Sequence, residues 1–341
     1  MPHVDKIIFE SKIARLLRAQ IDGSNGHVLQ TLAIDERLLG YRDDTVSRAE
    51  LAMALNAQLF SDLLERVPTA ARHVEELRQA GSKIVFDHGA LRTISGSTGH
   101  LPNGHAAFAR VLEPLGYVVG GIYPLPRLTM TGRAFVHLDL PEEIPQFFVS
   151  ELHVDQLADE AQVAAANVFA GSLDPLSSET LETLDELSRA KTLPFASASA
   201  LLGRLVAAFG RQHEEPALAD YETLLVHSKE AAWIATEGNA FNHATTRVPD
   251  VEALAEQLKA QGYPMKNAVE VSANGRVRQT AILADKVARK FRLPDGSMVE
   301  RAVPGSFYEF ISRDIDVGTG TLDLTFDSGN ATGIFAVTAV V

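Results

Sequence analysis

The sequence contains no cysteine and only one tryptophan among its 341 residues. Without thiols the chain cannot form a disulfide, a thiolate nucleophile, an iron–sulfur cluster or a cysteine-ligated zinc site. Any metal must therefore be held by histidine, aspartate or glutamate. Basic residues are also scarce, 31 against 44 acidic ones, for a formal net charge of −13. This balance argues against a nucleic-acid partner, because phosphate binding needs a concentrated basic surface.

Long apolar runs are missing as well. No segment approaches the roughly 20 consecutive apolar residues needed to span a bilayer. Residues 1–20 mix charged with apolar side chains and lack the apolar stretch of a signal peptide, so they predict an amphipathic helix. We therefore expect a cytoplasmic protein with no membrane partner. Hydrophobic residues make up 46% of the chain, a globular composition that leaves the oligomeric state open.

The hydrophobic periodicity changes three times along the chain. Helical spacing dominates the beginning and is clearest in residues 48–66, where leucines recur at intervals of three and four. A strand, a helix and more strands follow, then a second helical stretch, then the strand–helix–strand order again. We predict an N-terminal helical layer (1–82), a first βαβββ module (83–170), a helical insertion (171–235) and a second βαβββ module carrying most of the metal site (236–341).

Each predicted module has one helix, at 106–116 and 250–261. A Gly-Tyr pair follows each helix, and an aromatic residue stands two positions before a histidine on each opening strand (Phe86 before His88, Phe241 before His243). These shared features predict an internal structural repeat. The expected strands are 83–94, 117–123, 128–130, 134–138 and 146–153 in the first module, and 240–248, 269–271, 279–283, 289–293 and 307–313 in the second.

Three residues stand out as candidate metal ligands: His88 and His243 on the opening strands, and Glu309 on a closing strand. Two imidazoles and one carboxylate suit Fe, Mn, Co or Zn, and they leave coordination positions open for substrate and oxygen, as in non-haem Fe(II) oxygenases. Taken singly, a histidine in a strand is more often a hydrogen-bonded core or surface residue than a metal ligand. The repeat favours the metal, because equivalent positions in paired modules converge on one axis.

Arg92 is the candidate substrate-binding and catalytic residue. It lies four residues after His88, on the same face of a strand and roughly 13 Å further along. A guanidinium there would hold a substrate carboxylate in bidentate fashion; the alternative is an ion pair with an acidic residue such as Glu151. Glu151 sits in the first module roughly where Glu309 sits in the second, so it is also a possible fourth ligand, as in a Lewis-acid isomerase or lyase. We favour a supporting role for Glu151.

Several segments together carry a resemblance to a known family. FDHGALRTI, PQFFVSEL, NAFNHATTRV, SFYEFISR and SGNATGIF resemble the 2-oxoadipate dioxygenase/decarboxylase family, also called hydroxyglutarate synthases, over nearly the whole chain. The second module is also similar to the vicinal oxygen chelate superfamily. That resemblance implies an α+β fold in which paired βαβββ modules form a half-open barrel, here with added N-terminal and central helices.

The family resemblance also implies an activity. His88, His243 and Glu309 would hold Fe(II), with His88 and Arg92 contacting substrate and Arg92 binding its carboxylate. The reaction would convert 2-oxoadipate and O₂ to 2-hydroxyglutarate and CO₂ in lysine breakdown. Longer family members carry an insertion after the metal-binding glutamate, where this chain has only residues 310–341, so substrate contacts from that region cannot be transferred.

Two other classes of function remain open at this point. One is a non-oxidative, metal-dependent isomerase or lyase of the same fold, which would work without oxygen. The other is a binding module that takes up a small ligand without a metal.

Overall fold

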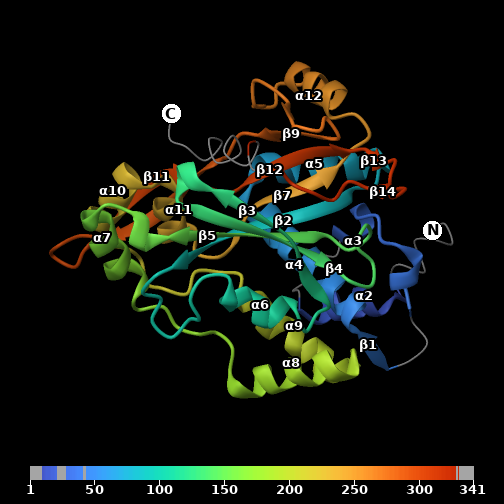
Figure 1. The fold of residues 1–341 in the computed structure, drawn as a ribbon, viewed down its shortest axis with the longest axis horizontal. Coiled ribbons are helices and arrows are strands. Elements are labelled where there is room, and N and C mark those ends of the chain that lie inside the picture. Colours follow the sequence, from blue (N-terminus) through green and yellow to red (C-terminus); the bar gives the residue numbers. More distant parts are fainter. Residues whose placement is uncertain (1–9, 21–27, 41–43, 328, 330–341) are drawn as a thin grey trace.

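The computed structural model describes residues 10–20, 28–40, 44–327 and 329. A curled, mixed eight-stranded sheet forms its centre, with helices packed around it (Figure 1). The strands are β2 (Val85–Ser95), β3 (Tyr117–Leu125), β4 (Met130–His137), β5 (Gln146–His153), β7 (Phe241–Arg247), β8 (Glu270–Val271), β9 (Val277–Ile282) and β12 (Phe307–Arg313). Their order across the sheet is β3-β4-β5-β2-β7-β12-β9-β8.

The sheet consists of two modules with the same topology. In each, one helix follows the first strand: α6 (Ala106–Leu112) after β2 and α12 (Val251–Ala260) after β7. The first strand pairs in parallel with the last, β2 with β5 and β7 with β12. Read outward from the antiparallel β2–β7 junction, the orders β2-β5-β4-β3 and β7-β12-β9-β8 correspond strand for strand. The predicted repeat and the paired βαβββ fold are confirmed.

Two strand predictions need correction. Residues 128–130 do not form a separate strand. Pro126 begins the 3₁₀ turn η3 (Pro126–Leu128), Thr129 adopts a left-handed φ of 52°, and β4 then runs unbroken to His137. The strand predicted at 289–293 exists as β10 (Lys286–Arg292), but it pairs with β11 (Met298–Pro304) in a separate two-stranded ribbon. This ribbon interrupts the second module between β9 and β12.

Helices flank the modules on the N-terminal side and between them. Before β2 lie α2 (Lys12–Gln20), α3 (Val28–Thr31), η2 (Glu36–Leu38), β1 (Thr45–Ser47), α4 (Arg48–Arg66) and α5 (Pro68–Gln79). Between the modules lie η4 (Val154–Gln156), α7 (Asp159–Phe169), α8 (Ser178–Ala190), β6 (Thr192–Pro194), α9 (Phe195–Ala207), α10 (Leu218–His227) and α11 (Lys229–Glu237). After β12 come β13 (Ile315–Asp316) and β14 (Thr321–Leu322). The division of the chain into four domains stays a prediction.

Local sequence explains where α4 and α5 begin. Ser47 caps α4, its hydroxyl accepting from the Glu50 amide while the Glu50 carboxylate accepts from the Ser47 amide. This reciprocal arrangement satisfies amides that would otherwise lack partners at a helix start. Pro68 lies after the end of α4 and opens α5. Proline is favoured in a first turn because its missing N–H would have no helical partner there.

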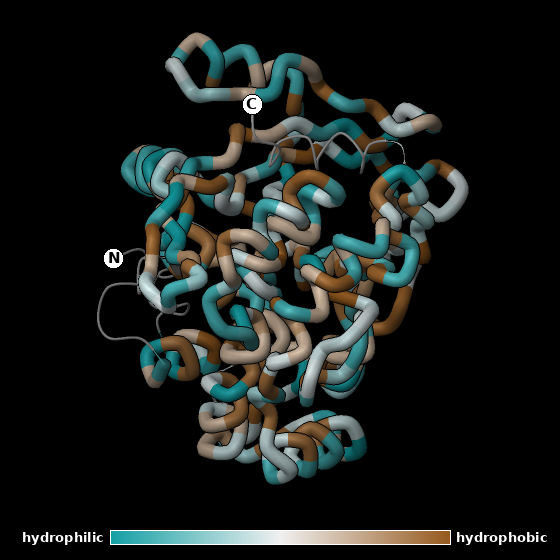
Figure 2. Tube along the Cα trace, turned by 90° about the vertical axis from the view of Figure 1, so that its left-hand side faces the viewer, coloured by the Kyte–Doolittle hydropathy of each residue, from teal (hydrophilic) through white to brown (hydrophobic). Residues whose placement is uncertain are grey.

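The largest core lies between the sheet and the helical layers. Tyr308 and Phe310 of β12 point into this core, where Tyr308 packs against Phe60 of the buried helix α4. Glu309 lies between them in sequence and therefore faces the opposite side of the sheet. At the bottom of Figure 2, hydrophilic and hydrophobic residues are mixed in the outer helices, and α8 buries only Thr180, Leu184 and Leu187. Alternation along β12 thus separates the core from the face that carries the candidate ligands.

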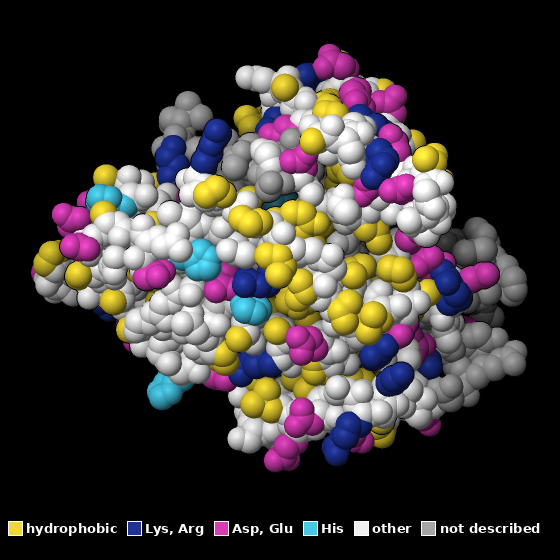
Figure 3. All heavy atoms as spheres, in the orientation of Figure 1, with side chains coloured by type: hydrophobic (Ala, Val, Ile, Leu, Met, Phe, Trp, Pro, Cys, Tyr) yellow, Lys and Arg dark blue, Asp and Glu magenta, His cyan; other side chains and the backbone are white. Residues whose placement is uncertain are grey.

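The surface carries both acidic and basic side chains, in keeping with the composition. On the face shown in Figure 3, acidic and basic side chains are interspersed with one another. In the described part of the chain, no helix is both long enough and apolar enough to cross a membrane.

A substitution at Gly89, next to His88, tests how tightly the junction of the modules is packed. A Cβ at this position would lie 2.1 Å from Cζ of Phe241, so Gly89→Ala should lower the free energy of unfolding by about 1–3 kcal/mol through overpacking. Gly171→Ala is the matched control, because nothing lies within 4 Å of its added Cβ. Urea unfolding of both variants checks this, and equal midpoints would contradict the packing at the junction.

Candidate metal centre

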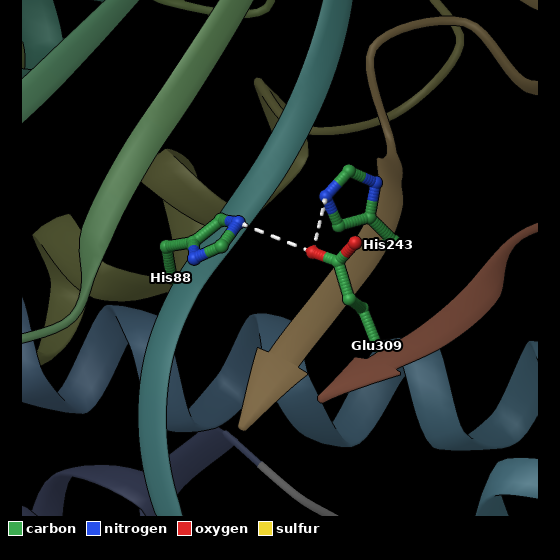
Figure 4. A group of neighbouring side chains, drawn as sticks. All are labelled: His88, His243 and Glu309. Atoms are coloured by element: carbon green, nitrogen blue, oxygen red, sulfur yellow. Dashed lines mark ion pairs between the residues drawn. The ribbon is translucent and has the colours of Figure 1, made fainter. Parts of the chain in front are cut away.

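Three neighbouring strands bring His88, His243 and Glu309 together (Figure 4). His88 lies on β2, His243 on β7 and Glu309 on β12, and all three are buried. The Nε2 atoms of His88 and His243 lie 3.7 and 3.6 Å from Oε2 of Glu309. One candidate ligand atom from each residue lies within 4.8 Å of the other two.

This donor set fits a divalent transition metal. Ligand atoms about 2.1 Å from one ion lie roughly 3.0–3.4 Å apart at octahedral or tetrahedral angles. The observed 3.6 and 3.7 Å therefore need to close by only a few tenths of an ångström. Among the described residues, Oε1 of Glu309 is buried and accepts no hydrogen bond. A cation between the three side chains would neutralise this carboxylate and supply the missing partner.

The residue before each histidine orients its ring. Nδ1 of His88 lies 2.8 Å from Oδ1 of Asp87, and Nδ1 of His243 lies 3.1 Å from Oδ1 of Asn242. Burial lowers the pKa of both histidines, that of His243 well below its ordinary value. A neutral ring that donates from Nδ1 offers its lone pair at Nε2, as metal-binding histidines do.

Thr245 joins two of the candidate ligands. Its hydroxyl donates to Oε2 of Glu309 at 2.7 Å and lies 3.0 Å from Nε2 of His88. Burial raises the pKa of Glu309 to about 8, and the Thr245 hydrogen bond acts in the opposite direction. The centre is thus built from neutral imidazoles and a carboxyl group that readily takes up a proton.

A buried arginine ties the centre to the C-terminal part of the chain. Arg313, four residues after Glu309 on β12, donates to both carboxylate oxygens of Asp87 at 2.9–3.1 Å. Burial alone would raise the pKa of Asp87, but Arg313 and His88 hold it well below its usual range. Arg313 also donates to the carbonyl oxygens of Asp323 and Thr325. The neighbouring Phe326 then places its ring edge-on to His88, with centroids 4.9 Å apart.

A small pocket opens beside the centre, lined by His88, Ala90, Leu91, Arg92, Phe148, Ser150, Asn242, His243, Gln279, Phe326 and Asp327. Arg92 is 1% exposed, and its guanidinium lies 5.0 Å from the ring centroid of Trp233. Burial lowers the pKa of Arg92 to about 10, opposed by the charge of Glu230. The structure therefore places a protonated guanidinium in the same pocket as His88 and His243.

Glu151 lies away from this pocket. Its carboxylate pairs with Arg133 and with His105, each at 2.7 Å. The predicted correspondence with Glu309 is wrong. Phe307 lies opposite His243 and Gln146 lies opposite His88, so the counterpart of Glu309, two residues further on, is Phe148. Glu151 points to the other face of β5, in the supporting role that the sequence favoured and not in a fourth ligand position.

Several residues of the site were missed in the sequence. Asp87 and Asn242 carried a visible signal, because each precedes a histidine in the repeat. Strand alternation could have identified Thr245 and Arg313, because Thr245 lies on the same face of its strand as His243, and Arg313 on the same face as Glu309. Phe326 carried none, because only the tertiary structure brings its segment across the pocket.

Comparisons with known proteins show which proteins the chain is similar to. The model of a family described as 2-oxoadipate dioxygenase/decarboxylase matches residues 44–322. The chloroplastic/amyloplastic 2-oxoadipate dioxygenase/decarboxylase of Oryza sativa subsp. japonica is 25% identical over 269 residues, 73% of this chain and 65% of that protein. The chloroplastic protein of that name from Arabidopsis thaliana is 28% identical over 180 residues, 50% and 41% of the two chains. The chain thus spans less than two thirds of the length of these curated relatives.

Solved structures show the same fold. A glyoxalase superfamily protein from Ralstonia eutropha JMP134 is 50% identical, with a TM-score of 0.89 over 93% of this chain and 98% of that one. The hydroxyglutarate synthase of Oryza sativa, solved in complex with 2-oxoadipate, is 21% identical, with a TM-score of 0.67 over 91% and 95% of the two chains. The vicinal-oxygen-chelate-like architecture is therefore confirmed.

Replacing any one of the three candidate ligands by alanine should weaken metal binding by more than about a hundredfold, because two donors cannot hold the ion alone. The buried carboxylate Glu151 provides the control, since Glu151→Ala removes an acid of β5 without touching the centre. Calorimetric titration of each metal-free variant with Mn(II) checks this. Full metal affinity in His88→Ala, His243→Ala or Glu309→Ala would exclude that residue, and a loss in Glu151→Ala would restore the four-ligand alternative.

Metal affinity should also depend on pH. Glu309 has a pKa of about 8 and must lose its proton to bind a cation, so affinity should fall about tenfold per pH unit below pH 8. The proton bound by Glu309 also changes the stability of the folded protein. Between its ordinary pKa and about 8 the folded metal-free protein binds the extra proton, so the contribution of Glu309 to stability decreases as the pH rises. Titrations between pH 6.5 and 8.5 in buffers of different ionisation enthalpy measure the released proton, and an affinity independent of pH would contradict this assignment.

Proposed function

The chain belongs to the 2-oxoadipate dioxygenase/decarboxylase family, and we propose that it is a non-haem Fe(II) enzyme that converts 2-oxoadipate and O₂ to 2-hydroxyglutarate and CO₂. One observation carries the proposal: His88 and His243, which lie together with Glu309 in a buried cluster, line the same pocket as the protonated Arg92. The lysine-breakdown setting and the cytoplasmic location expected from the sequence are part of the proposal.

With O₂ as the oxidant, the atoms balance without a second organic acid. The six-carbon 2-oxo acid loses its C1 carboxyl group as CO₂, and the two atoms of O₂ enter the remaining five-carbon acid, one in the new carboxylate and one in the hydroxyl group. Fe(II) held by two imidazoles and one carboxylate supplies the redox chemistry for coupling decarboxylation to the reduction of O₂. The side chains of the pocket hold the substrate in place and exclude water.

Arg92 suits the recognition of a substrate carboxylate. Its guanidinium is buried against Trp233, and a buried fork of donors pairs strongly with a planar carboxylate. The shortened acid must stay in the pocket after CO₂ departs if it is to receive the second oxygen atom. A carboxylate held by Arg92 keeps the two half-reactions in one place.

Aromatic side chains line the pocket beside the centre. The rings of Phe148 and Phe326 lie 4.7 Å apart between centroids, and the Phe326 ring also contacts His88. These apolar rings keep bulk water away from the reacting atoms, which strengthens the electrostatic interactions inside the pocket.

Oxygen consumption tests the proposal directly. Protein reconstituted with Fe(II) under argon is given 2-oxoadipate and then O₂, and O₂, CO₂ and 2-hydroxyglutarate are measured together. We expect equal amounts of O₂ consumed and of each product formed. Bound metal without O₂ uptake over a panel of 2-oxo acids would refute the oxygenase, and turnover under argon would establish a lyase or isomerase. Ligand binding that needs no metal would instead favour a binding module.

Arg92→Met should raise the KM for 2-oxoadipate by about tenfold or more, because a charge-assisted pair with a carboxylate is lost. Its affinity for Mn(II) should stay close to that of the wild type, since the guanidinium is not a candidate ligand. Arg110→Met breaks the bidentate pair with Asp174 outside the pocket and serves as the control. An unchanged KM and kcat in Arg92→Met would remove the assigned role.

A further inference from the structure

The two modules differ at the residue that orients each histidine. His88 is oriented by Asp87 in the first module, and His243 by Asn242 in the second. Both side chains present an Oδ1 atom to Nδ1 of the histidine. They differ in the second terminal atom, which is an oxygen in Asp87 and an NH₂ group in Asn242.

The second atom of Asp87 already has a partner. Arg313 donates to Oδ2 at 2.9 Å and to Oδ1 as well. Asp87 does not line the pocket beside the centre. Both oxygen atoms of the Asp87 carboxylate thus have partners, which are His88 and Arg313.

Asn242 is placed differently. It lines the pocket together with Arg92, and its side chain is 1% exposed. Within the described ranges, its Nδ2 atom is buried and donates no hydrogen bond. A buried amide donor loses its hydration without compensation unless a ligand accepts from it.

Chemistry fixes which end of the amide faces His243. A metal bound at Nε2 requires that the proton of the ring sit on Nδ1. That proton needs an acceptor, so Oδ1 of Asn242 must face the ring, at the observed 3.1 Å. The NH₂ group is consequently the end left for a ligand in the pocket.

We propose that Nδ2 of Asn242 donates a hydrogen bond to an oxygen atom of the 2-oxo-carboxylate end of the bound substrate. Asn242 then performs two tasks, since it orients a candidate metal ligand and binds the substrate end nearest to it. This inference rests on the proposed function, because it assigns the acceptor to a 2-oxo acid. It explains why an amide stands in the second module where the first has a carboxylate: a carboxylate at position 242 would repel the anionic substrate.

The test gives the second module the residue that precedes the histidine in the first module, an aspartate. Asn242→Asp keeps the acceptor for Nδ1 of His243 but replaces the donor by a negative charge. We expect the affinity for 2-oxoadipate to fall about a hundredfold or more, measured by calorimetry on Mn(II)-loaded protein under argon at pH 8. The affinity of the metal-free variant for Mn(II) should be unchanged or higher, because an added anion favours a cation. Structural damage would instead weaken both.

Two further variants keep the test decisive. Asn103 is exposed, and its Oδ1 accepts from the Gly96 amide. Asn103→Asp therefore adds the same charge outside the pocket and should change the affinity neither for Mn(II) nor for 2-oxoadipate. Asn242→Ala removes both contacts and should weaken the binding of Mn(II) and of 2-oxoadipate. If Asn242→Asp does not fold, as judged by its thermal melt, Asn242→Ala at saturating Mn(II) carries the test: weaker 2-oxoadipate binding supports the inference and wild-type binding overturns it.

A second ligand locates the contact. 2-Oxohexanoate shares the 2-oxo-carboxylate end of 2-oxoadipate and lacks its distal carboxylate, so Asn242→Asp should weaken its binding as well. A loss confined to 2-oxoadipate would overturn the placement, and wild-type affinities for both ligands in Asn242→Asp would overturn the inference while leaving the proposed function intact. Failure of the wild-type protein to bind any 2-oxo acid would overturn the proposed function and this inference with it.

Discussion

The antiparallel pairing of β2 with β7 is the interaction on which the rest of the structure depends. It joins the two modules into one sheet and sets Ala90 opposite His243 and Thr245 opposite His88. Each opening strand then pairs in parallel with the closing strand of its own module, so β12 places Glu309 opposite Thr245. Three candidate ligands from positions far apart in the chain meet because these two pairings share β7. The close contact between Gly89 and the Phe241 ring belongs to the same junction.

The repeat produces the centre, and departures from the repeat give it its chemistry. A fully symmetric pair of modules would supply a second carboxylate opposite Glu309, but Phe148 occupies that position. One carboxylate with two neutral imidazoles leaves open positions at a six-coordinate metal. The residues before the histidines break the symmetry again, since Asp87 is bound by Arg313 while Asn242 faces the pocket. One side of the centre is thus anchored to the protein, and the other is available to a ligand.

The sequence predicted the repeat and the candidate ligands because both have local signatures. Alternation placed Arg92 on the face of His88, and the aromatic residue two positions before each histidine marked the opening strands. The position of Glu151 was misjudged because strand register is fixed by pairing with a distant strand. The pairing of β5 with β2 makes Phe148 the counterpart of Glu309, and Glu151 lies three residues further on. A displacement by an odd number of residues moves a side chain to the other face. The contacts of Arg313 with Asp87, and of Phe326 with His88, join segments more than 200 residues apart. No local pattern carries such information.

The bond between Arg313 and Asp87 also bears on how the protein is made. The two residues are 226 positions apart, so a ribosome must synthesise most of the chain after Asp87 before the arginine that holds its carboxylate exists. Glu309 is translated almost as late, on the same strand as Arg313. A nascent chain that meets a metal ion earlier offers it two histidines and no carboxylate from β12. The complete set of candidate ligands therefore exists only after β12 has been synthesised.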